Sequence, residues 1–373
     1  MAALAPDAIH GEFVRLAQAG LTLHEYARAG VRVLRRAVAF DAAAAVWFDP
    51  AVGLPVDRWI DDSGLRRAEI ELDAADIDKF RELGASGRRA ARLSEATDGN
   101  PAGGRGHREP PRARGVGDEL RVVDVGDSGL RGGMVLYRRP EAPDFTARDV
   151  NVLASLAGEC AEARRVRLEQ DLSADGGAGD RGLLVLDDDD GIEMADAAAD
   201  AWLDELRATG RRLPVVVTAV AARVRAIESG RTDGAATVTV RARARSGRWV
   251  LVRGSALGNG GRAPRIAVTL EPARAPELAE VIADAYGLTA RERRVTELVA
   301  RGLPNVAIGD QLHLSPYTVQ DHLKAIFEKL EVSSRGQLVA RLFVDHSLGR
   351  STDKAWSKTR WGSHRLFASW SLL

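Results

Sequence analysis

Residues 288–342 read LTARERRVTELVARGLPNVAIGDQLHLSPYTVQDHLKAIFEKLEVSSRGQLVARL. The pattern is typical of four short helices joined by tight turns. Thr289 and Glu292 have the spacing of a capping box at the start of the first helix. Gly302 ends that helix, because glycine takes the left-handed cap conformation without a Cβ clash. A second short helix is expected over 305–312, so this part of the chain is predicted to be an all-α domain.

The third helix of the stretch has one apolar and one polar face. Ser315 can cap it and Pro316 suits its first position, so we expect it to run to about Leu330. At about 100° per residue, an apolar arc forms from Val319, Leu323, Ile326, Phe327 and Leu330. The opposite arc holds Tyr317, Asp321, Lys324, Ala325 and Glu328, with Gln320 on its flank.

The polar face carries side chains that can read DNA bases. Glutamine can pair with adenine through two hydrogen bonds, lysine can donate to guanine, and aspartate can accept from cytosine N4. In a helix-turn-helix protein, residues near the N-terminus of the second helix reach base edges in the major groove. Gln320, Asp321 and Lys324 are therefore our candidate base-reading residues.

The run Thr318-Val319-Gln320-Asp321-His322-Leu323-Lys324 fits the pattern T-V-x-x-H-x-K. With it, the whole segment resembles the DNA-binding domain of the LuxR (NarL/FixJ-like, GerE) transcriptional regulators. The resemblance implies a four-helix domain over 284–346, a helix-turn-helix over 305–324, double-stranded DNA as the target and RNA polymerase as a partner. We expect the DNA contacts to come from Tyr317, Thr318, Gln320, Asp321, Lys324, Lys329 and Arg335.

The charge of the segment indicates that one copy binds DNA weakly. From Gly287 to His346 there are eight Lys/Arg and seven Asp/Glu residues, a net charge of +1, and DNA affinity scales with the number of phosphates neutralised. We therefore expect a homodimer, with the apolar face of the fourth helix (Leu338, Val339, Leu342) as its seam. Asp321, and Gly309 where the family mostly has alanine, favour an alternative: a signal-binding or scaffold protein whose helical domain contacts proteins.

Composition sets wider bounds. The chain of 373 residues has room for two or three domains, 45% of its residues are hydrophobic, and its formal charge is zero. A zero charge gives no general attraction to nucleic acid or to an anionic membrane, and the apolar run 213–222 is too short to span a bilayer. Cys160, the one cysteine, is expected to be a small buried residue and fits a reducing cytoplasm. We expect a cytoplasmic bacterial protein, without a signal peptide at its start.

Residues 12–169 are predicted to form a first α+β sensor domain. A helix over 21–39 precedes strands at 41–48 and 55–60, a helix at 73–84, a Gly/Pro/Arg-rich loop over 94–118 and a hairpin at 119–138. Thr146 and Asp149 have capping spacing at the start of a long exit helix that is expected to reach about Gln170. This order resembles a GAF domain. A bilin would need a cysteine, and Cys160 lies on the exit helix.

A Gly/Asp-rich linker at 171–180 leads to a second sensor domain over 181–272, whose strands and hairpin resemble a PAS-like fold. This region contains no histidine and no cysteine, which excludes a histidine-ligated haem and a cysteinyl flavin adduct there. The sequence thus predicts no cofactor and no metal, and leaves an unknown small-molecule or protein effector as the signal. Neither a P-loop nor a Gly-x-Ser-x-Gly or His-Glu-x-x-His motif occurs, so no enzyme is predicted.

Two segments remain at the end of the chain. Residues 273–286 are predicted to form a linker helix, with Leu278, Val281 and Ile282 on one apolar face that needs a partner. The available partners are the second sensor domain and the helices of the DNA-binding segment. Residues 347–373 contain three tryptophans and are expected to be disordered.

Overall fold

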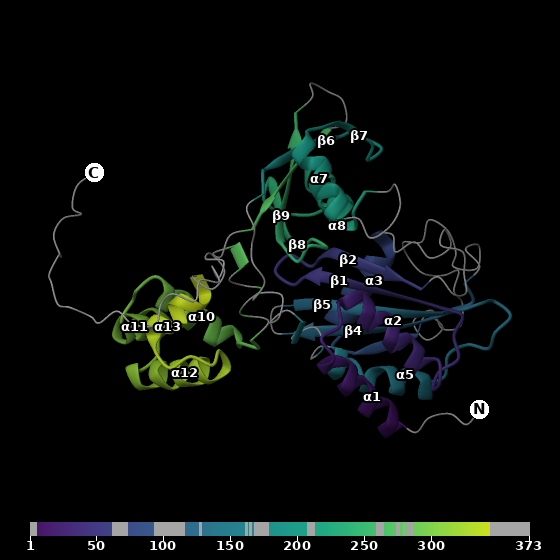
Figure 1. Cartoon of the computed structure of the whole chain (residues 1–373), viewed down its shortest axis with the longest axis horizontal. Helices are drawn as coiled ribbons and strands as arrows, with labels where there is room; N and C mark the ends of the chain where they lie inside the picture. The colour runs from purple at the N-terminus through teal and green to yellow at the C-terminus, as the bar shows by residue number, and fades with distance from the viewer. Residues whose placement is uncertain are drawn as a thin grey trace, which may run out of the picture.

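The computed structural model contains two sheet domains followed by a helical domain (Figure 1). No helix of the described part of the chain has the length and apolar character needed to cross a membrane. The predicted disordered tail at 347–373, and nearly all of the arginine-rich loop at 94–118, lie outside the described residues. The structure describes residues 6–61, 74–92, 116–126, 129–160, 163, 166–167, 179–206, 213–258, 265–273, 277–278, 281, 283 and 286–343.

The first sheet domain (described residues from 6 to 167) is built on an antiparallel sheet with the strand order β2-β1-β5-β4-β3. Its strands are β1 (Ala42–Asp49), β2 (Leu54–Ile60), β3 (Ala90–Arg92), β4 (Asp118–Gly126) and β5 (Gly129–Arg138). One face is covered by α1 (Pro6–Gln18), α2 (Leu23–Leu34) and α5 (Ala147–Ser155), and the other by α3 (Ala74–Ala85) (Figure 1).

Strand β1 shows why this sheet has two cores. Successive side chains of a strand point to opposite faces. Ala43 and Ala45 belong to the core under α1, α2 and α5, whereas Ala44 and Val46 belong to the core under α3. Because both faces are buried, the strand is apolar at every position from Ala42 to Phe48 instead of alternating with polar residues.

Two helices of this domain are shorter than the sequence pattern predicts. Thr146 forms the complete capping box that the sequence predicts for α5. Thr22 forms a second complete capping box at the start of α2, which the sequence analysis did not single out. Helix α2 ends at Leu34, and α5 ends at Ser155 before residues 157–160 become helical again. The segments after both helices also place buried side chains in the core. The hydrophobic periodicity of the sequence therefore continues past the true helix ends, and the predicted helices are too long.

The second sheet domain (described residues from 179 to 273) has the strand order β7-β6-β10-β9-β8. Counted within each domain, both sheets therefore have the order second, first, fifth, fourth, third. The elements are β6 (Gly182–Leu186), β7 (Ile192–Ala195), α7 (Ala197–Leu206), α8 (Val215–Glu228), β8 (Thr237–Arg243), β9 (Trp249–Leu257) and β10 (Arg265–Pro272). These two antiparallel sheets with helices confirm the predicted α+β class of the N-terminal region.

The two sheet domains touch along β2. Leu54 of β2 is buried within the apolar core of the second domain, among residues of α8 and β8. Next to it, the buried carboxylate of Asp49 accepts hydrogen bonds from Arg241 of β8, at 2.9 Å from the backbone nitrogen and 3.3 Å from Nη1. The contact therefore combines an apolar core with a polar anchor at its edge.

The C-terminal helical domain (described residues from 277 to 343) contains α10 (Ala290–Ala300), α11 (Asn305–Leu312), α12 (Pro316–Lys329) and α13 (Arg335–Phe343). These four helices agree with the predicted all-α domain. Leu278, Val281 and Ala283 of the predicted linker helix are buried in the same apolar cluster as the four helices. The linker therefore packs mainly with the C-terminal helical domain, and Trp249 and Ala273 of the second sheet domain pack against the same cluster. Ile282 lies outside the described residues.

Candidate nucleic-acid interface

The turn between α11 and α12 is held by backbone and side-chain hydrogen bonds. His313 ends α11 in the left-handed conformation with φ 54°, and the Leu314 amide donates to the Gly309 carbonyl at 2.9 Å. Ser315 Oγ then caps α12 by accepting from the Thr318 amide at 3.1 Å. These contacts fix the angle between the two helices.

Gly309, an expected departure from the family pattern, lies at the tightest point of this turn. A Cβ built on this residue would lie 2.6 Å from the Leu314 carbonyl oxygen. Contacts that short do not occur without a shift of the backbone. In this chain, glycine therefore allows a closer approach of the turn to α11 than alanine would.

Helix α12 separates its residues into a buried and an exposed face, as the sequence predicts. Val319 and Ile326 are fully buried and Leu323 nearly so, which fixes the rotation of the helix on the domain core. The exposed residues are Pro316, Tyr317, Gln320, Asp321, Lys324, Glu328 and Lys329. Tyr317 is 81% exposed, an unusual position for a large aromatic side chain, and no described residue covers it.

The predicted contact residues form two groups. Tyr317, Gln320, Asp321 and Lys324 lie together on the N-terminal half of α12, exposed to solvent. Thr318 is half-buried, and its hydroxyl lies 2.9 Å from Ser315 Oγ within the cap. Whether these five side chains contact DNA remains a prediction.

Lys329 and Arg335 hold the helices of the domain together. Lys329 Nζ donates to Glu292 Oε2 at 2.7 Å and to the Gly287 carbonyl at 3.0 Å, which joins the end of α12 to the start of α10. Arg335 donates to Asn305 Oδ1 at 3.2 Å and to the Leu303 carbonyl, which joins α13 to the start of α11. Lys329 and Arg335 therefore have a structural role in the domain. Whether they also contact DNA stays a prediction.

Glu292 is the buried acid of this arrangement. Burial alone would raise the pKa of its carboxyl, but the hydrogen bonds from Lys329 and the Thr289 backbone amide outweigh it and hold the pKa below its ordinary value. The carboxylate is therefore charged at neutral pH, and Lys329 balances that charge.

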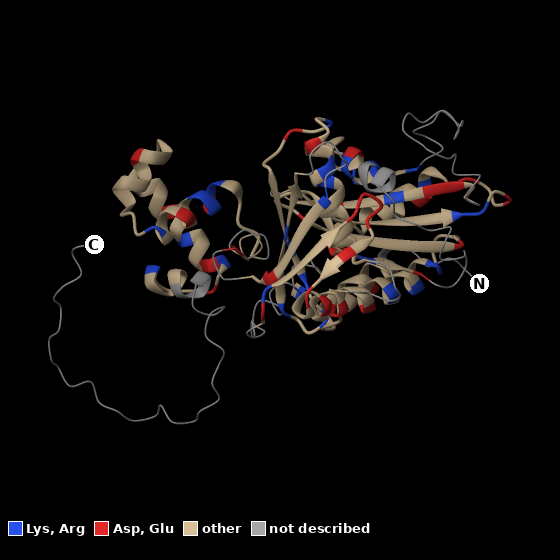
Figure 2. Cartoon of the chain, turned by 90° about the horizontal axis from the view of Figure 1, so that it is seen from above, with Lys and Arg blue, Asp and Glu red and all other residues tan. Residues whose placement is uncertain are grey.

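The helices of the C-terminal helical domain contain both basic and acidic residues (Figure 2). Sequence reasoning missed one cation: Arg291 of α10, exposed, donates through Nη2 to the Leu312 carbonyl at 2.6 Å. It therefore lies beside the end of α11, next to the turn. Arg291 comes close to the turn only because α10 packs on α11, and no local sequence motif indicates this packing.

The position of α13 differs in part from the predicted dimer seam. Leu338 is fully buried in the core of its own domain, and Val339 is half-buried against the same core. Leu338 therefore cannot face a second copy, and our expectation that it belongs to the seam is wrong. The side chain of Leu342 lies outside the described residues, while Gly336 and Gln337 are exposed.

A short helix, a left-handed turn and a second helix with an exposed polar N-terminal half define a helix-turn-helix domain. The family model described as "Bacterial regulatory proteins, luxR family" matches residues 287–342. This segment is thus a helix-turn-helix domain of the luxR family, as the sequence pattern predicted.

Curated relatives match mainly in the same segment. The monoamine regulon transcriptional regulator of Klebsiella aerogenes is 44% identical over 57 residues, 15% of this chain and 25% of that protein. The transcriptional regulatory protein DesR of Bacillus subtilis is 38% identical over 85 residues, 22% of this chain and 38% of that protein. The chain thus spans well under half the length of each of these relatives. Among solved structures, the phycoerythrobilin-bound GAF domain from a cyanobacterial phytochrome is similar with 16% identity and a TM-score of 0.34, covering 45% of this chain and 98% of that chain.

Proposed function

We propose that the protein is a sequence-specific DNA-binding transcriptional regulator of the bacterial cytoplasm, controlled by its two sheet domains. The observation that carries the proposal is the exposed face of α12. No element of the described part of the chain covers Gln320, Asp321 and Lys324 there, and the other face of the helix is fixed by buried Val319 and Ile326. A helix held in this way can enter the major groove with its N-terminal half.

The protein is proposed to act on DNA as a homodimer. A net charge of +1 from Gly287 to His346 neutralises few phosphates, so two copies on a symmetric site are needed for tight binding. Leu338 lies in the domain core, and Leu342 stays a candidate for the seam. Among the described side chains of α13, the exposed positions Gly336 and Gln337 are further candidates. RNA polymerase is proposed as the partner through which bound dimers change transcription.

Control by the sheet domains is supported by contacts that join them to the linker. Arg241 of β8 bonds to Asp49 of the first sheet domain and also donates through Nε to the Glu277 carbonyl. Glu277 in turn accepts from Arg253 of β9 at 2.9 Å. A change in either sheet domain can therefore reach the segment that packs its Leu278 and Val281 into the C-terminal helical domain.

The base-reading role of α12 is tested with Lys324→Ala, and Arg294→Ala is the matched control. Arg294 is an exposed cation of the same domain, so its loss removes the same charge from α10. A binding site is first selected from a randomised duplex pool. We expect Lys324→Ala to weaken binding to that site by about 1–3 kcal/mol per subunit and binding to random DNA much less. Arg294→Ala should weaken both only slightly.

The same assay decides between this proposal and its alternative. If Lys324→Ala and Arg294→Ala weaken binding to selected and random DNA equally, Lys324 is a phosphate contact and not a base reader. If the selection returns no preferred sequence and neither variant changes binding, a scaffold or signal-binding protein is the better account. The low net charge and Asp321 on the exposed face are the observations that favour this second candidate.

A further inference from the structure

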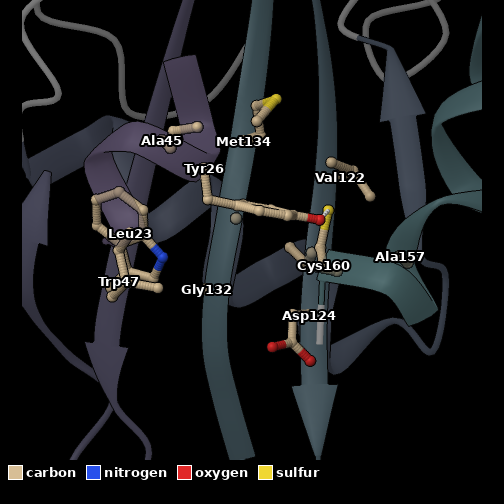
Figure 3. Close-up of a pocket in the computed structure, with 13 residues that line it drawn as sticks. Leu23, Tyr26, Ala45, Trp47, Val122, Asp124, Gly132, Met134, Ala157 and Cys160 are labelled. Carbon is tan, nitrogen blue, oxygen red and sulfur yellow. Dashed lines mark hydrogen bonds between the residues drawn. The ribbon is translucent and has the colours of Figure 1, made fainter. Parts of the chain in front are cut away.

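The first sheet domain contains a small, partly open cavity of about 50 Å³ between its sheet and the helical residues that pack on it (Figure 3). Leu23, Tyr26 and Ala27 of α2 form one wall, and Ala157 and Cys160 of the helical segment after α5 form another. Residues of β1, β4 and β5 form the floor. The cavity therefore lies between α2 and the helical segment that follows α5.

The hollow exists because the middle strand of the floor lacks a side chain. Trp47 of β1 and Asp124 of β4 are both paired with Gly132 of β5, so the three residues form one row across the sheet. Figure 3 shows the side chains of Trp47 and Asp124 on either side of the Gly132 position. A larger residue at 132 would fill the space between them.

Both flanking side chains are held in place by neighbours. The Trp47 indole stacks on the ring of His24, with centroids 5.5 Å apart and an interplanar angle of 16°. The Asp124 carboxylate, on a residue only 5% exposed, is paired with Arg131 at 3.0 Å. The cavity thus presents a fixed aromatic surface and a fixed hydrogen-bond acceptor across an otherwise apolar floor.

The remaining walls carry no charge. Burial raises the pKa of the Cys160 thiol to about 12, so the thiol is protonated at neutral pH and is no nucleophile. The Tyr26 hydroxyl donates to the Glu159 carbonyl at 3.4 Å and lies 3.9 Å from Cys160 Sγ. Arg131 already neutralises the Asp124 charge, so a cationic ligand would gain little attraction here. An uncharged ligand also gives up less hydration energy on entering the cavity than a cation does.

We propose that this cavity binds a small, uncharged, single-ring aromatic molecule that carries one N–H or O–H donor for Asp124. Drug-sized ligands occupy pockets of roughly 300–1,000 Å³, so a space of about 50 Å³ excludes multi-ring cofactors. A cavity that fully encloses a benzene ring measures about 150 Å³, so a single ring would fill this space and extend through its open side. The ring would lie over Gly132, against Trp47, with its donor toward Asp124. The site gives the sensor role of the proposed function a location and a ligand class.

Binding here would link two helical segments that are far apart in the sequence. A ring over Gly132 would touch Tyr26 and Leu23 of α2 and Cys160 of the exit segment at the same time. A ligand shifts an equilibrium only by its different affinity for the two states. Filling this space favours the arrangement in which α2 and residues 157–160 close on the sheet.

The test uses methyl NMR of the full chain, labelled with ¹³C-methyl methionine. The chain has three methionines: Met134 lines the cavity, and Met194 is 61% exposed on the second sheet domain and serves as an internal control. The probes are phenol, which has the donor, and toluene, which has the same shape without it. We expect phenol to shift the Met134 methyl resonance and leave Met194 unchanged, with about tenfold weaker binding of toluene, the effect of one hydrogen bond.

Two glycine variants give the steric test. A Cβ at Gly132 would lie 3.4 Å from the Val46 carbonyl oxygen and 3.5 Å from Trp47 Cδ1, so Gly132→Ala fits the fold and fills part of the cavity. It should abolish the phenol shift, whereas Gly158→Ala, which meets nothing within 4 Å, should keep it. A silent Met134 methyl with both probes, a shift that survives Gly132→Ala, or equal affinity for phenol and toluene overturns the proposal. None of these readouts involves DNA, so they are independent of any failure in DNA binding.

Discussion

His313 is a non-glycine residue in the left-handed region, with φ 54°, at the sharpest point of the helix-turn-helix. For a residue with a Cβ this conformation costs roughly 1–2 kcal/mol. Glycine avoids this cost, but its larger conformational entropy in the unfolded state cancels part of the gain. We expect His313→Gly to raise the local free energy of unfolding of α11 and α12 by about 0.5–1 kcal/mol. Native-state hydrogen exchange of the amides in these helices measures it. A decrease would mean that the histidine ring itself stabilises the turn.

His24 gives the first sheet domain a pH-dependent stability. Burial lowers the pKa of its imidazole, but the hydrogen bond to Asp57 Oδ2 at 2.8 Å and the charge of Asp57 outweigh burial and hold the pKa above its ordinary value. A group whose pKa is raised on folding stabilises the folded state fully below the unfolded pKa and loses this contribution as pH rises through the folded pKa. The His24–Asp57 pair should thus stabilise the domain in mildly acidic solution.

The variant His24→Gln isolates this contribution. At about pH 5.5 the wild-type domain should be more stable than the variant, and the difference should shrink steadily towards about pH 8. Hydrogen exchange of the β1 and β2 amides at several pH values reports the difference. A constant difference over this range would show that stacking on Trp47, and not protonation, is the stabilising contribution of His24.

Sequence periodicity predicted which face of α12 is exposed, because that depends only on the spacing of apolar residues such as Val319 and Ile326. It could not predict that Lys329 and Arg335 hold other helices. Their partners, Glu292 and Asn305, lie 37 and 30 residues earlier in the chain and come close only through tertiary packing. Long-range side-chain partners of this kind leave no local pattern.

At the scale of single elements, α13 allows the dimer to be tested without disturbing the domain core. Gly336 is exposed, and an added side chain meets only Ser334 Oγ at 4.0 Å. We expect Gly336→Glu to keep or raise helix stability by up to about 1 kcal/mol, because glycine is a poor helix former. If two copies meet along α13, the paired negative charges should lower dimerisation and DNA affinity, which sedimentation and gel shifts measure.

Leu338→Asp is the contrasting variant. It places a charge in the domain core, since Leu338 is fully buried, and should unfold the C-terminal helical domain. A dimer unaffected by Gly336→Glu would place the seam elsewhere in the chain.

Helix α8 is the element that local propensity describes least well. It begins Val215-Val-Val217, a run of β-branched residues that favours a strand. The helix forms because Pro214 precedes it and its apolar residues pack on one sheet while also meeting β2 of the other. Val216, Val217, Val220 and Val224 are buried there. Tertiary burial outweighs the small propensity differences, and only the folded structure shows it.

The strand order of the sheets is likewise a property of the whole chain. Hairpins such as β4–β5 and β8–β9 follow from turns a few residues long, and the sequence predicted them. The pairing of β1 with β5 and of β6 with β10 joins strands about 80 residues apart, so no turn signal marks it. The shared order of the two sheets therefore emerges only in three dimensions.

Arg241 of the second sheet domain bonds both to Asp49 of the first sheet domain and to Glu277 of the linker. It therefore joins three parts of the molecule. We expect Arg241→Ala to destabilise the contact between the sheet domains by about 1–3 kcal/mol, because the buried Asp49 carboxylate loses a charged partner. The full chain should then show a DNA affinity closer to that of a fragment containing residues 273–346. Calorimetry and gel shifts measure the two effects.

The control is Arg245→Ala. Arg245 donates to the Asp204 carbonyl at 2.7 Å within the second sheet domain and does not bridge domains through that bond. It should change stability by no more than about 0.5 kcal/mol. Equal effects of both variants on DNA affinity would argue against transmission through Arg241.

Trp249 lies where the second sheet domain meets the apolar cluster of the C-terminal helical domain, and its indole Nε1 is buried without a hydrogen-bond partner among the described residues. An indole N–H shielded in this way emits at short wavelength, and water admitted beside it moves the emission to the red. The chain thereby contains its own fluorescent reporter at the contact between the second sheet domain and the C-terminal helical domain. If the other tryptophans are replaced by phenylalanine, the emission maximum of Trp249 reports in real time whether the C-terminal helices stay packed against the second sheet domain or separate from it.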